Sequence, residues 1–142
     1  MKKTAAIITA FLGISMFMFG VLKFIDPFKT WYVTQVTKSE LPFPSLSYWS
    51  GQLGEIVVGL ALILTLFPSI FKNRNRIWTL FLVGNLLIIP MMLTAIYVHM
   101  QPAVPESALP LQIRPPFIPG FFLVLACINI YLGKKFSKNK AK

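Results

Sequence analysis

Four long apolar runs constrain the fold of this chain more than any other feature. They cover residues 5–25, 49–70, 77–98 and 117–133. A bilayer core about 30 Å thick takes roughly 20 helical residues, so runs of this length are typical of membrane-spanning helices. We therefore predict an all-α fold, an integral membrane four-helix bundle that forms a single domain over residues 1–142.

The composition excludes an ordinary water-soluble domain. Hydrophobic residues make up 56% of the chain and charged residues only 13%, whereas soluble domains carry about a quarter charged residues. A net charge of +10 would suggest nucleic-acid binding on a polar domain, but here the basic residues lie between apolar runs. We therefore expect a lipid bilayer as the surroundings and no nucleic-acid partner.

The distribution of basic residues predicts an orientation. Ten lie at the N-terminus, between the second and third runs and in the C-terminal tail: Lys2, Lys3, Lys72, Arg74, Arg76, Lys134, Lys135, Lys138, Lys140 and Lys142. The other four are Lys23, Lys29, Lys38 and Arg114. Because cytoplasmic loops are rich in Lys and Arg, we expect both termini to be cytoplasmic. The protein would then be a multi-pass component of the plasma (inner) membrane.

The beginning of the chain also resembles a secretory signal peptide. The apolar part of such a peptide usually covers 7 to 15 residues and ends at small residues. The first run is about 20 residues long and ends differently. We therefore expect an uncleaved first span.

The two longer connections, 26–48 and 99–116, are expected to face outward. The first is rich in aromatic residues and proline, which favours a short amphipathic helix or a loop at the headgroup level. The second contains a proline-rich segment, residues 101–116. We expect this segment to be extended and to cap the bundle.

Polar residues of the runs and connections are predicted to converge in the outer half of the bundle. The candidate pocket residues are Lys23, Gln52, Glu55, Tyr97, His99 and Arg114. Glu55 is the one acidic residue within a run, expected about five residues below the outer surface. An ionisable group in hydrocarbon normally faces the protein interior and finds a partner. Glu55 is either a structural partner of Lys23 or a functional carboxylate.

Other polar residues have simpler interpretations. His99 is either an ordinary histidine at the membrane interface or a ligand or proton-relay group. One His and one Glu are too few for a typical metal site, so no metal is expected. The lone cysteine, Cys127, excludes an intramolecular disulfide and a Cys-based cluster.

Small and amide residues at helical spacing predict close helix packing. The candidates are Gly13, Gly20, Gly59, Asn85 and Asn129. Small residues let membrane helices approach closely, and side-chain amides hydrogen-bond between helices.

Several segments together resemble the DoxX-like family of small four-span membrane proteins. They are Met-Phe-Gly-Val-Leu-Lys-Phe at 18–24, Glu-Leu-Pro-Phe-Pro at 40–44, Gly-Gln-Leu-Gly-Glu-Ile-Val-Val-Gly-Leu-Ala-Leu at 51–62, Thr-Ala-Ile-Tyr-Val-His at 94–99 and Arg-Pro-Pro-Phe at 114–117. The resemblance covers nearly the whole chain. It implies a four-helix membrane bundle and an accessory role beside membrane oxidoreductases. Lys23, Glu55 and His99 match the recurring polar positions of that family, which has no agreed catalytic residues.

Three functions follow as hypotheses. The first is an accessory subunit or partner of a quinone-linked redox complex, in which the outer pocket holds a quinone headgroup. The second is a non-enzymatic assembly factor or chaperone for other membrane proteins, and a membrane protein partner or a homo-oligomer is expected in either case. The third is a small proton-coupled transporter that uses Glu55. No haem or flavin motif is visible, and we expect no catalytic activity from the chain on its own.

Overall fold

The structure, a computed structural model, describes residues 3–71 and 73–138. Within these ranges it contains helices and no strand, which confirms the predicted all-α class. The five α-helices are α1 (Lys3–Leu22), α2 (Phe28–Lys38), α3 (Pro44–Thr65), α4 (Arg74–Met100) and α5 (Phe117–Lys138). Three 3₁₀ turns, η1 (Pro68–Ile70), η2 (Glu106–Ala108) and η3 (Pro110–Gln112), lie in the connections.

Four of the helices are long and apolar enough to cross a membrane. The apolar stretches cover Lys3–Leu22, Pro44–Thr65, Asn75–Met100 and Phe117–Lys134. Each matches one of the four predicted runs, so the multi-pass helical class is confirmed at this level. Among the basic residues used to predict orientation, Lys2, Lys72, Lys140 and Lys142 lie outside the described residues.

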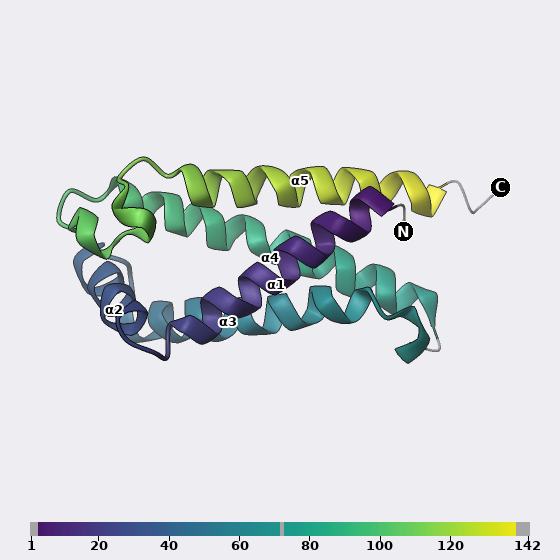
Figure 1. The fold of residues 1–142 in the computed structure, drawn as a ribbon, viewed down its shortest axis with the longest axis horizontal. Coiled ribbons are helices and arrows are strands. Elements are labelled where there is room, and N and C mark those ends of the chain that lie inside the picture. The colour runs from purple at the N-terminus through teal and green to yellow at the C-terminus, as the bar shows by residue number, and fades with distance from the viewer. Residues whose placement is uncertain (1–2, 72, 139–142) are drawn as a thin grey trace.

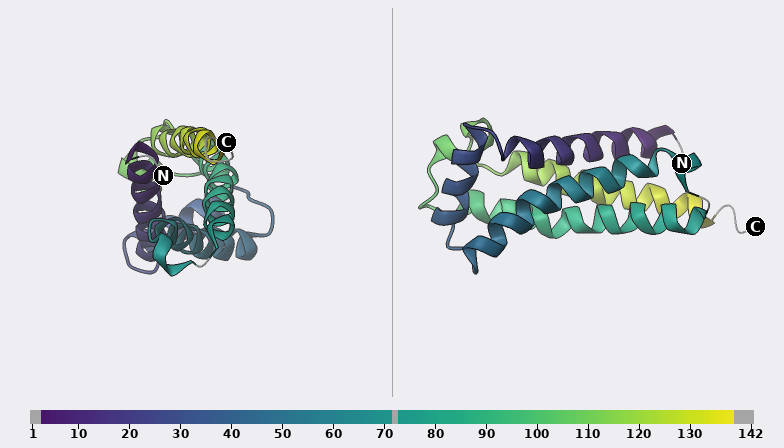
Figure 2. Two further views of the ribbon diagram at one scale, coloured as in Figure 1. Left: turned by 90° about the vertical axis from the view of Figure 1, so that its right-hand side faces the viewer. Right: turned by 90° about the horizontal axis from the view of Figure 1, so that it is seen from below.

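The four long helices lie side by side in a ring, as the end-on view of Figure 2 shows. Helix α1 packs against α3 and α5, and α4 packs against the same two helices from the other side. The start of α1, the α3–α4 connection and the end of α5 lie at one end, which we call the termini end (Figure 1). Helix α2 lies across the opposite end, called the α2 end, together with the connection between α4 and α5.

The helix boundaries differ from the predicted runs, most of all in α3. This helix begins at Pro44 and ends at Thr65, whereas residues 49–70 were expected. Proline suits the first turn of a helix because it has no N–H to leave unpaired there. Helix α1 ends at Leu22, so Lys23 follows it directly. Helices α4 and α5 extend beyond the predicted 77–98 and 117–133.

The proline-rich segment after α4 is folded rather than extended, so that prediction was wrong. It contains the turns η2 and η3, and the side chains of Val104, Ala108 and Leu109 are buried. The Gln35 side-chain amide of α2 donates to the carbonyl of Ala108. Proline limits the backbone to turns and extended stretches, and these contacts select the turns. A short helix or a loop was predicted for residues 26–48, and the structure contains a helix there, α2.

Apolar side chains occupy both the interior and the periphery of the helix ring. The buried cluster at its centre consists of Leu12, Met16, Val58, Leu62, Ile88, Met92, Phe122 and Ala126. Large apolar side chains such as Ile14, Val57, Leu86 and Val124 are exposed on the outside of the four long helices. Hydrophobic surface on all sides of a helix is typical of a membrane span.

Candidate functional site

An ion pair joins the end of α1 to α3. The Lys23 ammonium nitrogen Nζ lies 2.7 Å from Glu55 Oε1. The two side chains are only 18% and 12% exposed, respectively. Because desolvation of a charge costs several kcal/mol, charges this deeply placed are normally paired. The structure therefore brings together the two charged residues that the sequence placed at a similar depth.

Tyr32 of α2 completes the surroundings of this ion pair. Lys23 Nζ lies 4.1 Å from the centroid of the Tyr32 ring, a distance suited to a cation–π interaction. The Tyr32 hydroxyl donates to the Tyr48 carbonyl oxygen at 2.9 Å. A Cβ atom at Gly51 would come within 2.2 Å of that hydroxyl oxygen, so a larger residue there would displace the Tyr32 side chain. Helix α2 is thereby held over the pair.

The environment of Tyr32 raises the pKa of its phenol. Burial is the largest cause because it penalises the phenolate. The negative charge of Glu55 and the neighbouring Tyr48 act in the same direction. The neutral phenol can therefore keep its hydrogen bond well into the alkaline range.

Gln52 lies one helical turn before Glu55 on the same face of α3. Its side chain is fully buried, at 0% exposure. Among the described residues, neither Nε2 nor Oε1 of this amide has a hydrogen-bond partner. Glu55 Oε2 is likewise buried without a hydrogen-bond donor in the described part of the chain. Since buried polar atoms are nearly always paired, these three atoms mark the candidate site. We call Lys23, Tyr32, Gln52 and Glu55 the polar site.

His99 and Arg114 belong to a second group, at the connection between α4 and α5. The Arg114 guanidinium donates to Glu106 Oε1 at 3.1 Å and to the carbonyl oxygens of Gln101 and Val104. The buried ring of His99 places Nδ1 3.2 Å from the Arg114 carbonyl oxygen. A carbonyl only accepts, so Nδ1 carries the proton. This group ties the connection to the end of α4.

The six predicted pocket residues therefore fall into separate places. Lys23, Gln52 and Glu55 share the polar site, whereas His99 and Arg114 bind the connection. Tyr97 is 43% exposed. Among the described residues, no ion pair or hydrogen bond links the first group to the second. Glu55 also lies deeper in its helix than expected, eleven residues after Pro44, because α3 begins earlier.

Glycines let α1 and α3 approach closely below the polar site. A Cβ atom at Gly20 would lie 2.9 Å from the Gln52 carbonyl oxygen, and one at Gly59 only 2.4 Å from the Phe17 backbone nitrogen. At Gly13 the nearest heavy atom, a side-chain carbon of Ile63, would be 3.0 Å away. The close backbone approach leaves no space for larger residues at the first two positions.

A buried polar cluster connects three helices nearer the termini end. Asn129 Nδ2 of α5 donates to Asn85 Oδ1 of α4 at 2.9 Å and to Thr9 Oγ1 of α1 at 3.0 Å. The Asn85 amide donates to the Phe81 carbonyl oxygen at 2.8 Å. All three side chains are fully buried. Since the amides have protein partners, the cluster serves helix packing.

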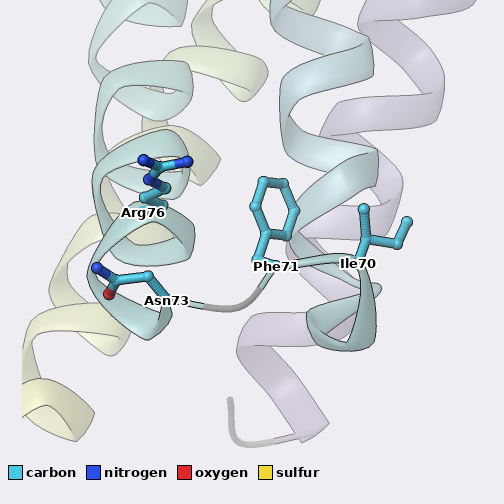
Figure 3. A pocket seen from close by; sticks show the side chains of 4 residues that line it. All are labelled: Ile70, Phe71, Asn73 and Arg76. Atoms are coloured by element: carbon cyan, nitrogen blue, oxygen red, sulfur yellow. The ribbon is translucent and has the colours of Figure 1, made fainter.

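Two surface cavities are lined by residues other than those of the polar site. One, of about 430 Å³, is at the α3–α4 connection and is lined by Ile70, Phe71, Asn73 and Arg76. Figure 3 shows Phe71 between α4 and α3, Arg76 alongside α4 and Ile70 near the end of α3. The Asn73 side chain is engaged in capping α4, where it accepts from the Asn75 N–H at 2.8 Å. The other cavity, of about 210 Å³, lies between α2 and the start of α3.

The polar site offers hydrogen-bonding groups but few metal ligands. Within the described residues no group of three His, Cys, Asp or Glu side chains is gathered. Tyr32 is the residue that sequence reasoning missed at this site. Its place in an aromatic-rich connection was the available signal, but nothing in the spacing indicated that it lies over Lys23.

Comparison of this chain with protein-family models, with curated proteins and with solved structures gives no match. The DoxX-like resemblance therefore stays a prediction from the sequence motifs.

Proposed function

We propose that this protein is an accessory subunit or partner of a quinone-linked membrane redox complex, and that its polar site receives the quinone headgroup. The observation that carries the proposal is the fully buried Gln52 amide, whose donor and acceptor have no protein partner in the described chain. A quinone headgroup is small, uncharged and polar at its oxygens. Lys23 and Glu55 balance each other's charge, so a neutral ligand fits the site better than an ion does.

The proposed arrangement in the membrane follows from the two ends of the helix ring. Of the four acidic residues of the chain, Asp26 and Glu40 flank α2, Glu106 begins η2, and Glu55 lies halfway along α3. Lys3, Arg74, Arg76 and the basic residues near the end of α5 lie at the termini end. By the positive-inside rule, we place the termini end in the cytoplasm of a plasma (inner) membrane. The four long helices then cross it as a bundle, with the polar site toward the outer leaflet.

Access to the site is proposed at the ion pair. Gln52 is enclosed, whereas Lys23 and Glu55 retain some exposure. The Lys23 side chain is flexible and starts just beyond the end of α1, so its movement can open a path to Gln52. A headgroup oxygen would then accept from Gln52 Nε2.

The test is the quinone content of the protein purified in mild detergent from quinone-containing membranes. We expect bound quinone in the wild type and a loss of most of it in Gln52→Leu. Leu53→Ala is the matched control, because Leu53 is the next residue of α3 but is 46% exposed. Wild-type protein without quinone, together with unchanged quinone-linked respiration in Glu55→Gln cells, would remove the basis of this proposal.

A non-enzymatic assembly factor is the second candidate. It is supported by large exposed apolar side chains around α2 and the start of α3, among them Phe28, Phe43, Leu46 and Trp49. Such a surface at the membrane interface suits contact with other membrane helices. Cross-linking at Leu46, near the start of α3, should then capture a client protein in intact membranes. The same cross-linker at Ile7, near the start of α1 at the termini end, should not.

A proton-coupled transporter has less support. The buried cluster between the polar site and the Asn85–Asn129 cluster is formed by apolar side chains such as Leu62 and Ile88. A proton or polar substrate needs polar groups or water along its path through a membrane. A single copy of the described chain offers none through this cluster.

A further inference from the structure

The unpaired groups of the polar site differ in the hydrogen bonds that they can form with a ligand. Gln52 carries both a donor, Nε2, and an acceptor, Oε1, and both lack protein partners among the described residues. An ionised carboxylate such as Glu55 is an acceptor only. Its Oε1 is engaged by Lys23, and its buried Oε2 has no donor in the described chain.

The positive charge of Lys23 acts directly on Glu55. The ammonium group has three donors and no acceptor, so the oxygen 2.7 Å from it must accept. This short contact favours the carboxylate over the protonated acid. The remaining oxygen, Oε2, therefore requires a hydrogen-bond donor from the ligand.

The two redox forms of a quinone headgroup differ at this point. The oxidised form presents carbonyl oxygens, which only accept hydrogen bonds. The reduced form, a hydroquinone, presents hydroxyl groups that both donate and accept. A quinone carbonyl can accept a hydrogen bond from Gln52, but it leaves Glu55 Oε2 without a donor. It also places the electron-rich carbonyl oxygen beside the electron-rich Oε2. A hydroxyl can donate to Glu55 Oε2 and accept from Gln52 Nε2 at once.

From these contacts we infer that the polar site selects the reduced, hydroquinone form of its ligand, with a ligand hydroxyl donating to Glu55 Oε2 and accepting from Gln52 Nε2. This inference rests on the proposed function and adds the redox state that the site prefers. No electron or proton is transferred in this binding step. A hydrogen bond from a neutral donor to a buried carboxylate supports a preference of about tenfold or more.

The experiment compares decylubiquinol with decylubiquinone, under anaerobic conditions, for binding to the full chain in lipid nanodiscs. Empty nanodiscs provide the correction for partition into lipid. We expect the wild type to bind the quinol at least about tenfold more tightly. In Glu55→Gln the new amide can donate to a carbonyl, so the preference should fall to near unity. Gln52→Leu should weaken both ligands by similar factors, and Leu53→Ala should change neither.

The outcomes separate this inference from the proposed function. Equal binding of the two forms by the wild type, or tighter binding of the quinone, overturns the selection of the reduced form but leaves a headgroup site. Absence of binding beyond empty nanodiscs overturns the proposed function and this inference together. Binding that neither Gln52→Leu nor Glu55→Gln changes places the ligand elsewhere and also overturns the inference. The wild-type comparison needs no variant, so it holds even if Glu55→Gln folds poorly.

Discussion

Lys23 and Glu55 are joined across two helices, with Lys23 Nζ 2.7 Å from Glu55 Oε1. Lys23 stands just after the end of α1, and Glu55 lies halfway along α3. The pair therefore fixes the register of the end of α1 against the middle of α3. Tyr32 adds a third element to the contact, since its ring lies 4.1 Å from the same ammonium nitrogen.

We predict strong coupling between the two charges. Lys23→Met or Glu55→Gln alone leaves a poorly compensated charge or a stranded polar group, at a cost of about 3 kcal/mol in the free energy of unfolding. The double variant removes both charges and should lose less than the sum of the single losses. Thermal unfolding of all four proteins in the same detergent measures this coupling. Additive losses would show that the pair contributes nothing to stability.

The sequence indicated this pair as one of two alternatives for Glu55, although one step of the reasoning was inaccurate. Two charged residues in apolar runs that cross in opposite directions have few partners other than each other. The expected depth of Glu55 assumed a helix that begins near residue 49, but α3 begins at Pro44. The pair forms nonetheless, because Lys23 directly follows α1 and its long side chain reaches Glu55.

The role of Tyr32 could not be predicted in the same way. Its position over Lys23 depends on how α2 lies across the ends of the long helices (Figure 2). That placement is set by contacts between distant segments, such as the Gln35 amide with the Ala108 carbonyl. Helical periodicity describes one face of one helix and carries no information about such contacts. The same limit explains why His99 was grouped with Glu55, whereas its ring contacts the Arg114 backbone.

Gly59 and Gly120 provide a matched test of close helix packing. A Cβ atom at Gly59 would lie 2.4 Å from the Phe17 backbone nitrogen, which cannot move without shifting α1. We expect Gly59→Ala to lower the free energy of unfolding by about 1 to 3 kcal/mol. At Gly120 a Cβ atom would meet no described atom within 4 Å. Gly120→Ala should cause no loss, and alanine in a helix is favoured over glycine by about 0.5 to 1 kcal/mol.

The thermal unfolding midpoints in detergent compare these two variants directly. Equal effects of the two substitutions would contradict the close approach of α1 and α3 at Gly59. The result is independent of any ligand, because neither glycine belongs to the polar site.

Asn129 tests the buried polar cluster near the termini end. Asn129→Leu removes the donor to Asn85 Oδ1 and to Thr9 Oγ1. Hydrogen bonds between membrane helices are worth about 0.6 kcal/mol on average, and the loss of two such bonds predicts a decrease of about 1 kcal/mol. Ile128→Leu, at the neighbouring and 42% exposed position of α5, is the control and should leave stability unchanged. A stability of Asn129→Leu equal to that of the control would mean that the cluster is energetically neutral.

The raised pKa of the Tyr32 phenol predicts a loss of stability in alkaline solution. Burial, together with Glu55 and Tyr48, raises the pKa of this phenol in the folded protein above the value of about 10 expected in the unfolded chain. Above that pH the unfolded chain releases the tyrosine proton while the folded protein keeps it, so the free energy of unfolding falls as the pH rises. The contribution of Tyr32 is therefore complete below pH 10 and is lost progressively above it. Unfolding midpoints of the wild type and Tyr32→Phe should converge between pH 10 and the raised pKa, whereas Tyr131→Phe, at a 69% exposed position, should follow the wild type throughout. A constant difference between the wild type and Tyr32→Phe across this range would show that the phenol is not held in its neutral form by the fold.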